Sequence, residues 1–388
     1  MTNGRRSENW KTRFLLEPDV HFLNHGSFGA CPRPVFEEYQ RIQLELERQP
    51  VRFLGREFRN RMAGARIELA AYLGADADDL TYVPNTTTGL NIVARSLNLQ
   101  PGDEVLGTDH EYGALDRTWS FVCQQAGAHY LRAPISVPVV SADEVVEQVW
   151  SQVTERTRVL FISHITSATA VILPIEPLIA KAREAGIFTV IDGAHAPGMI
   201  PLDLDALGAD AYSGNCHKWM LAPKGSGFLH VRRDVQHLIQ PLIVSWGWQS
   251  DEPSSSQFVD YTEWQGTRDI SAFLAVPAAI RFMEQHDWPT VAQRCSDLLH
   301  EYVPKILAAT GQPALATNSL EWFTQMASFV IPTSDWQGLK NHLYDKYHIE
   351  APTIWWNNKT LLRISVNAYT HAEDLNGLVR ALRSEADS

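Results

Sequence analysis

Residues 159–192 read VLFISHITSATAVILPIEPLIAKAREAGIFTVID. Val159–Ile162 and Phe188–Ile191 are short runs of branched and aromatic residues, which are typical of strands buried in a sheet. Between them, Pro174–Ala185 carries apolar residues at helical spacing and is followed by Gly186, a common helix terminator. This pattern predicts a strand, a crossover helix and a second strand.

The same alternation extends in both directions, from about Thr81 to Val231. Residues 105–107 (VLG) and 129–131 (HYL) predict two further strands, and helical patterns separate the strands. Repeated strand and helix units of this kind build mostly parallel sheets. We therefore expect an α/β fold in which ligands bind beyond the carboxyl ends of the strands.

The pattern changes after Gly266, where longer amphipathic helices and mixed strands predict a smaller α+β domain. The helices are expected at Ala272–Gln285 and Val291–Ala309, and the strands around Ser328–Ile331 and Leu361–Val366.

We accordingly expect two domains. Residues 60–270 form the large domain, and the N-terminal segment, residues 1–59, joins residues 271–388 in the small C-terminal domain. Within the N-terminal segment, Glu37–Arg48 predicts a helix whose charged outer face is solvated.

Composition narrows the classes of function. The 388 residues carry a net charge of −12 and no long basic run, so binding to nucleic acid is not expected. Cys31, Cys123, Cys216 and Cys295 lie far apart, which predicts reduced thiols and no metal site. No apolar signal segment and no run of ~18 apolar residues occurs. We therefore expect a cytoplasmic protein, away from membranes, with a small-molecule partner.

The most informative motif is SGNCHKW at residues 213–219, which follows the strand-like residues 210–212. A single lysine is usually a solvated surface residue, but a lysine in a small turn at a strand end is poorly explained by solvation. Partial burial or a neighbouring cation lowers the pKa of an amine enough to make it a nucleophile. Lys218 is therefore a candidate for Schiff-base chemistry.

Two other features accompany the lysine. Asp192 ends a predicted strand, where its carboxylate can pair with a pyridinium nitrogen, although such residues are more often caps or turn formers. Residues 84–91 (PNTTTGLN) open the apolar helix Leu90–Leu97, and a helix N-terminus suits a phosphate. Capping explains one threonine, whereas three consecutive hydroxyls exceed what a cap requires. Together these features point to pyridoxal 5′-phosphate (PLP).

The motifs resemble those of the class V aminotransferase-like PLP enzymes of fold type I, and most closely those of the isopenicillin N epimerases and their relatives. The resemblance covers most of the chain and includes NHGSFG at 24–29, DHEY at 109–112, DGAHAPG at 192–198, HKW at 217–219, LAP at 221–223 and the segment 263–270. It implies a large domain with a mostly parallel sheet of the seven-stranded type, a small α+β C-terminal domain, and a homodimer with shared active sites.

The resemblance also implies roles for individual residues. Lys218 would carry the Schiff base, Asp192 would pair with the ring nitrogen, and His110 would stack on the cofactor, with Tyr112 as the alternative cover. Further cofactor contacts are expected from Thr86, Thr87, Asn215 and His217 around the phosphate and from Ser167 and His195 near the phenolic oxygen. Asn215 departs from the serine that is usual at its position.

The resemblance also implies which residues contact the substrate and which one reaches the neighbouring subunit of the dimer. Arg363 occupies the place of the arginine that grips the substrate α-carboxylate, a task that suits a planar guanidinium. Asn24, His25 and Ser27 lie in a loop that approaches the substrate, although their residue types also suit a simple turn. Thr267 matches a threonine that reaches the phosphate of the neighbouring subunit.

The reaction stays open at this level, because PLP labilises every bond at Cα and the protein selects one of them. The leading hypothesis is epimerisation or racemisation of an amino-acid-like substrate. Lys218 would remove the Cα proton, and a second group would return a proton on the other face. His25, His110, Tyr112 and His195 are equal candidates for that second group.

Three alternatives remain. A C–S β-lyase acting on cysteine conjugates or sulfoxides needs no further catalytic residue, and an aminotransferase is not excluded. A cysteine desulfurase is disfavoured because residues 322–337 contain no cysteine. A PLP-binding homologue without turnover is disfavoured because Lys218, Asp192 and Arg363 occur together.

Overall fold

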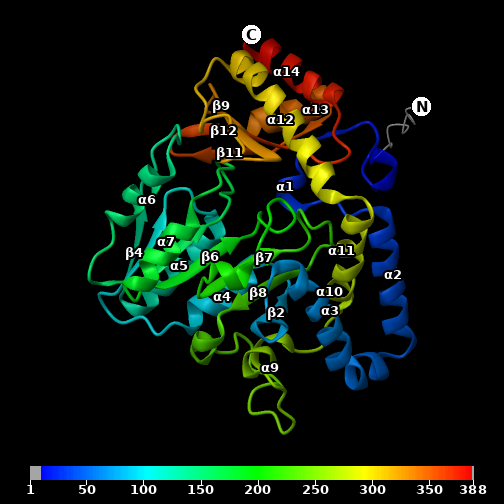
Figure 1. Ribbon diagram of the computed structural model, residues 1–388. Coiled ribbons are helices and arrows are strands. Elements are labelled where there is room, and N and C mark those ends of the chain that lie inside the picture. Colours follow the sequence, from blue (N-terminus) through cyan, green and yellow to red (C-terminus); the bar gives the residue numbers. More distant parts are fainter. Residues whose placement is uncertain (1–9, 387–388) are drawn as a thin grey trace, which may run out of the picture.

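The computed structural model describes residues 10–386, and a seven-stranded sheet forms its centre (Figure 1). Its strands are β2 (Leu80–Val83), β3 (Glu104–Thr108), β4 (His129–Ala133), β5 (Thr157–Ser163), β6 (Phe188–Gly193), β7 (Ala211–Asn215) and β8 (Gly227–Val231). The spatial order is β2-β8-β7-β6-β5-β3-β4. β8 runs antiparallel to both of its neighbours, and all other neighbouring strands are parallel. This confirms the predicted mostly parallel sheet.

Helices cover both faces of this sheet. Alternate residues of β5 enter two separate hydrophobic clusters, with Leu160 and Ile162 in one and Val159 and Phe161 in the other. A strand buried on both faces needs a continuous apolar run, which explains the composition of β5. The surrounding helices are α3 (Phe58–Leu73), α4 (Thr86–Ser96), α5 (Gly113–Ala126), α6 (Ala142–Trp150), α7 (Ile175–Glu184), α8 (Leu204–Leu207) and α9 (Gln257–Glu263). The crossover helix predicted between β5 and β6 is α7.

A smaller α+β layer lies above the large sheet in Figure 1. Its antiparallel sheet has the order β11 (Thr353–Trp356), β12 (Lys359–Ser365) and β9 (Met326–Ile331). The helices α12 (Trp288–Thr310), α13 (Trp336–Tyr347) and α14 (Ala372–Ala386) accompany it. The predicted strands around 328–331 and 361–366 are therefore present, as is the helix predicted at 291–309.

The helix predicted at 272–285 is interrupted. The chain forms α10 (Ser271–Leu274) and, after Ala275, a new helix α11 (Val276–Gln285). Pro277 lies in the first turn of α11, where its missing N–H costs no helical hydrogen bond. The proline therefore marks a helix start inside the predicted run.

The N-terminal segment packs against the helices α10 and α11 and against the small layer. α2 (Arg33–Arg48) begins four residues before the predicted helix, and the strand β1 (His21–Phe22) pairs with β10 (Ile349–Glu350) of the small layer. Residues 1–9 and 387–388 of the expected small domain lie outside the described residues. The remaining short elements are η1 (Trp10–Arg13), α1 (His25–Phe28), η2 (Val51–Arg56), η3 (Ala77–Asp79) and η4 (Arg233–Leu238).

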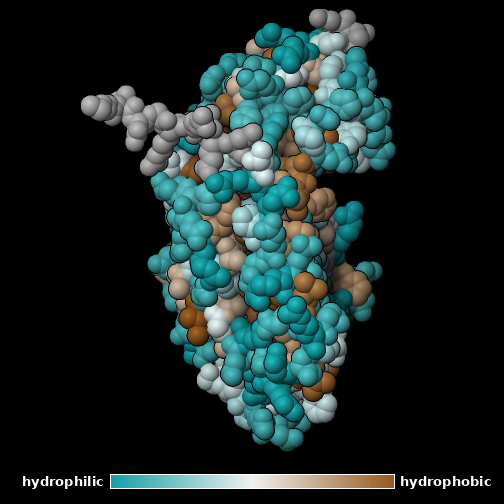
Figure 2. All heavy atoms as spheres, turned by 90° about the vertical axis from the view of Figure 1, so that its right-hand side faces the viewer, coloured by the Kyte–Doolittle hydropathy of each residue, from teal (hydrophilic) through white to brown (hydrophobic). Residues whose placement is uncertain are grey.

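The side that carries α2 and α11 is mostly hydrophilic, with hydrophobic residues in small groups (Figure 2). Leu44 of α2 is one exposed apolar residue on these N-terminal elements, and Val51 of η2 is another. In the described part of the chain, no helix has both the length and the apolar character needed to cross a bilayer.

Candidate active site

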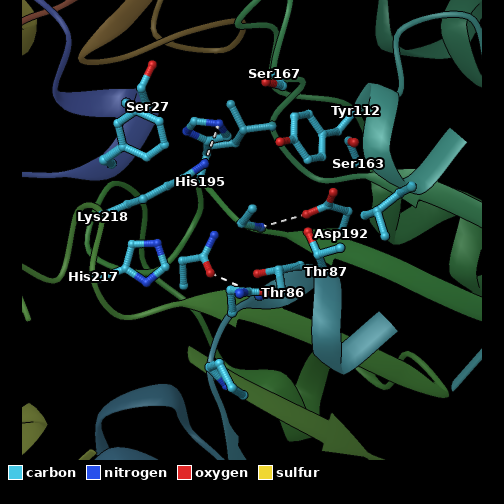
Figure 3. A pocket seen from close by; sticks show the side chains of 18 of the residues that line it. Ser27, Thr86, Thr87, Tyr112, Ser163, Ser167, Asp192, His195, His217 and Lys218 are labelled. Carbon is cyan, nitrogen blue, oxygen red and sulfur yellow. Dashed lines mark hydrogen bonds between the residues drawn. The ribbon is translucent and has the colours of Figure 1, made fainter. Parts of the chain in front are cut away.

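A cavity of about 400 Å³ lies at the carboxyl ends of the parallel strands, where the fold predicts a ligand site (Figure 3). Thr86 follows β2, Ser163 ends β5, Asp192 lies in β6, and Lys218 follows β7. Because these strands are neighbours or near neighbours in the sheet, residues about 130 positions apart in the chain meet at one edge. Arg363 of β12, in the small layer, also lines the cavity.

The turn that carries Lys218 is held against the N-terminal loop. His25 Nε2 lies 3.0 Å from the carbonyl oxygen of Lys218. Gly29 has a φ of 71°, and a Cβ atom there would lie 2.0 Å from the carbonyl oxygen of His217. Only glycine permits this close approach in a left-handed conformation. The loop at residues 24–29 therefore sets the position of the lysine backbone.

The amine of Lys218 faces the cavity. Its Nζ lies 3.1 Å from His195 Nε2. Burial lowers the pKa of Lys218, the charge of Arg363 acts in the same direction and Asp192 partly opposes them, so that the pKa is about 7. A large share of this amine is therefore neutral near neutral pH, as a nucleophile requires.

Asp192 is fully enclosed near the lysine. Its Oδ1 accepts a hydrogen bond of 2.9 Å from the backbone N–H of Ala194. Burial raises the pKa of this carboxyl to about 6, while the Ala194 N–H and the charge of Lys218 act in the opposite direction. A buried carboxylate with so little compensation favours a cationic partner, and a protonated pyridinium nitrogen supplies that charge.

A recess of the cavity, lined by Thr86, Thr87 and Asn215, lies at the start of α4. Asn85 caps the helix by accepting a 2.9 Å hydrogen bond from the N–H of Thr88. The N–H of Thr86 donates to Asn215 Oδ1 at 3.0 Å, which leaves the amide NH₂ of Asn215 available. The hydroxyl of Thr86 is buried and has no hydrogen-bond partner among residues 10–386. A helix N-terminus with an unpaired buried hydroxyl fits an anion such as the phosphate of PLP.

Arg363 supplies a buried cation to the lining of the cavity. Its Nη1 donates to the carbonyl oxygen of Ser167 at 2.7 Å and to the Ser167 hydroxyl at 3.2 Å, and its Nη2 donates to Ser27 Oγ at 3.0 Å. Burial lowers the pKa of Arg363 to about 10, so the side chain remains charged at neutral pH. No carboxylate of residues 10–386 forms an ion pair with it, and its Nε is unpaired there. This suits the carboxylate of a bound substrate.

Several residues predicted for the site line the cavity together: Ser27, Thr86, Thr87, Tyr112, Ser167, Asp192, His195, Asn215, His217, Lys218 and Arg363. Sequence reasoning did not assign the other lining residues, and three of these are Ser163, Asn85 and Phe28. Ser163 and Asn85 could have been found, because one ends a strand and the other precedes the threonine run. Phe28, which is 71% exposed, carries no signal in the sequence.

His110 does not line the cavity. It is fully buried, with Nδ1 2.7 Å from Thr169 Oγ1 and Nε2 3.3 Å from the carbonyl oxygen of Ile135, and its ring meets Trp356 edge-on at 4.7 Å. The chain turns after β3 so that Tyr112 enters the cavity instead. Of the two rings expected to cover the cofactor, only Tyr112 reaches the cavity. That Tyr112 stacks on PLP stays a prediction.

Three further predicted residues also lie outside the cavity lining. Asn24 donates to Glu350 at 2.8 Å, and His25 joins Tyr369 to the backbone of Lys218. These two residues fix the N-terminal loop and make no direct approach to the space for a substrate. Thr267 is exposed and away from the cavity of its own chain.

Comparisons with known sequences identify the family. The family model for aminotransferase class V matches residues 30–378. Isopenicillin N epimerase from Amycolatopsis lactamdurans is 36% identical over 389 residues, which cover 97% of each chain. A probable chloroplastic L-cysteine desulfhydrase from Arabidopsis thaliana is 28% identical and covers 94% of this chain and 84% of that protein.

Solved structures share the fold. The apo cysteine desulfurase from Thermococcus onnurineus has a TM-score of 0.84 at 18% identity, and the whole of each chain is covered. The cystine C–S lyase C-DES, in complex with its product cysteine persulfide, has a TM-score of 0.79 at 22% identity and covers 94% of this chain and 98% of that one. A C-DES variant is described with glycine covalently linked to its PLP cofactor. These likenesses confirm the predicted fold type I architecture.

Proposed function

Because this chain belongs to the class V aminotransferase family, we propose that it is a PLP-dependent enzyme that inverts the configuration at the α-carbon of an amino acid. The observation that carries the proposal is the placement of Lys218. Its amine faces a cavity that also contains Asp192 and the charge of Arg363. The similarity to isopenicillin N epimerases over nearly the whole chain favours inversion over other reactions at Cα.

Bound PLP withdraws electrons from Cα and so weakens its bonds. The residues of this chain would hold and steer the reacting groups. Asp192 would keep a proton on the ring nitrogen, and the recess at Thr86 and Asn215 would hold the phosphate. Arg363 would bind the substrate carboxylate, and Lys218 would take the Cα proton through an amine whose pKa lies near 7.

Tyr112 is our candidate for the second proton donor. Of the four side chains considered from the sequence, His25 and His110 do not line the cavity, and His195 lies beside Lys218. Tyr112 lines the cavity and stands opposite Lys218 in Figure 3, with its hydroxyl directed inward. A proton donor on the face opposite the lysine is what inversion requires.

The proposed enzyme is a homodimer in which Thr267 reaches the phosphate site of the neighbouring subunit. Its exposed position outside the cavity of its own chain is compatible with that role. The loop between η4 and α9 also exposes Ile243, Val244 and Trp246, with 84% of Trp246 accessible. Apolar side chains this exposed are typical of an interface.

A C–S β-lyase is the second candidate. Relatives named as cysteine desulfhydrases reach 30% identity, and such a reaction begins with the same removal of the Cα proton. It requires Lys218 but no donor on the opposite face. The two functions therefore differ in whether Tyr112 is needed.

The test follows the fate of Cα. The holoenzyme is incubated in D₂O with L- and D-amino acids and cysteine conjugates, and Cα deuterium, chirality and pyruvate are measured together. Inversion with deuterium and no pyruvate is expected, whereas pyruvate with ammonia would make the protein a lyase. Lys218→Ala should abolish both outcomes, and Lys181→Ala, an exposed lysine of α7, is the matched control. Tyr112→Phe should stop inversion while exchange of one enantiomer continues.

A further inference from the structure

Trp219, next to the reactive lysine, is tied to the same histidine as that lysine. Its indole Nε1 donates to His195 Nδ1 at 3.3 Å, while His195 Nε2 lies 3.1 Å from Lys218 Nζ. Trp219 is 1% exposed, and the ring of His195 is also buried. The three side chains thus form a short buried chain of polar atoms that ends at the amine.

The partners of His195 determine which of its nitrogens carries the proton. An indole N–H can only donate, so Nδ1 of His195 must accept and is unprotonated. The neutral ring then carries its proton on Nε2. That N–H points at Lys218 Nζ, which can accept it only through the lone pair of a neutral amine.

We propose that Trp219 is a positioning residue that locks His195 in the Nε2–H tautomer, so that a hydrogen-bond donor always faces the amine of Lys218. The lock favours the neutral amine over the ammonium, because an ammonium would bring two donors face to face. Trp219 therefore acts on the reactive nitrogen through His195 and need not touch any substrate.

The surroundings support a neutral imidazole. Burial holds the pKa of His195 well below its usual range, and the charges of Lys218 and Arg363 act in the same direction. His25 is also buried, with a pKa lowered to about 3 mainly by burial. The other ionisable groups that act on this pair are Asp192, which raises the pKa of Lys218, and His25 and His217, which both lower that of His195.

His25 also packs against the indole of Trp219. A carbonyl oxygen can only accept, so His25 Nε2 donates to the oxygen of Lys218 and Nδ1 accepts from the Tyr369 hydroxyl. The rings of His25 and Trp219 lie 4.9 Å apart. This packing gives Trp219 a structural role as well, and a test must separate that role from the tautomer lock.

The direct readout is the protonation of the His195 ring in the apoprotein. Long-range ¹H–¹⁵N NMR of protein labelled with ¹⁵N-histidine distinguishes the two tautomers, and the signal missing in His195→Gln identifies the residue. The wild type should show a protonated Nε2 and an unprotonated Nδ1. Trp219→Phe keeps an aromatic ring but removes the N–H, so the Nδ1–H form should gain population. A wild-type ring protonated on Nδ1, or an unchanged ring in Trp219→Phe, would overturn the proposal.

Trp119→Phe is the matched control. Trp119 is fully buried, and its Nε1 has no hydrogen-bond partner among residues 10–386, so the change removes the same atoms without removing a hydrogen bond. Its NMR spectrum should keep the wild-type tautomer of His195. A shift of equal size in this variant would mean that loss of packing, and not loss of the N–H, moves the proton.

A second readout covers the case in which Trp219→Phe folds poorly. The rate at which acetic anhydride acylates Lys218 in the apoprotein is measured against pH by peptide mass spectrometry. His195→Gln should retain the wild-type profile, because an amide can accept from Trp219 and donate to Lys218 at once. His195→Phe should slow acylation several-fold near pH 7, and equal profiles for the two variants would contradict the proposal. Neither readout requires turnover, so a wrong reaction assignment leaves this test intact.

Discussion

At the scale of single residues, the proposed chemistry depends on Lys218 and the side chains around it. The lysine combines a pKa near 7 with a position at the edge of a cavity, and the motif around it is sufficient to select it from the sequence. The choice between His110 and Tyr112 could not be made from the sequence. The two rings are two positions apart, and the path of the chain after β3 decides which of them enters the cavity.

The pH dependence of cofactor capture follows from Lys218. Its pKa is lowered in the folded protein, so the neutral, nucleophilic amine gains population as the pH rises through about 7. The rate at which the apoprotein captures PLP, followed by near-visible absorbance, should increase between about pH 6 and about pH 8 and then level off. An increase centred near the ordinary lysine pKa of about 10.4 would contradict this expectation.

Arg363→Lys tests the carboxylate site. The change keeps a positive charge but removes the planar pair of donors that a carboxylate fits. A lost hydrogen bond to a charged group costs about 1.5–3 kcal/mol, so KM for the amino acid should rise roughly ten- to hundredfold. The affinity for PLP serves as the internal control and should change little. An unchanged KM would remove Arg363 from substrate binding.

At the scale of elements, the sequence predicted the consecutive strands β3 to β7 and the crossover helix α7 because hydrophobic periodicity there reports burial directly, whereas β2 and β8 were not identified individually. The helix predicted at 272–285 is divided into α10 and α11. Pro277 lies within the predicted run, where it can follow the end of one helix and stand in the first turn of the next. The arrangement of α4 against β7 could not be read from the sequence, since it depends on contact between residues that lie far apart in the chain. That contact leaves no space for a Cβ atom at Gly89, which would lie 2.4 Å from Ser213 Oγ.

Gly89→Ala should therefore displace α4. Overpacking of this kind costs roughly 1–3 kcal/mol, and the shift should also weaken the phosphate recess at Thr86. Chemical denaturation and the Kd for PLP measure the two effects. Gly64→Ala in α3 is the matched control, because nothing lies within 4 Å of its Cβ position. That control should gain about 0.5–1 kcal/mol of stability, and equal behaviour of the two variants would refute the packing argument.

At the scale of the whole molecule, the site combines residues from segments that no local sequence pattern places together. The sheet edge supplies Asp192 and Lys218, the small layer supplies Arg363, and the N-terminal loop supplies Ser27. Each motif could be recognised in the sequence, but their convergence depends on how the small layer packs on the large sheet. The proposed dimer extends the same dependence to a second chain.

Sedimentation of the holoenzyme tests the dimer. A particle of about twice the 43.6 kDa chain mass is expected. Trp246→Glu should increase the monomer fraction because it places a charge on the exposed apolar loop. Thr267→Ala should weaken PLP binding without changing the mass. A wild-type monomer with full affinity for PLP would contradict the shared site.

The most direct test of the central claim is to fix the cofactor where it binds. The holoenzyme is reduced with borohydride and digested, and the peptides are analysed by mass spectrometry. We expect a pyridoxyl group on Lys218 alone and no labelling of Lys218→Ala, with Lys181→Ala labelled as the wild type is. A pyridoxyl group on another lysine, or a yellow protein that carries none after reduction, would contradict the account.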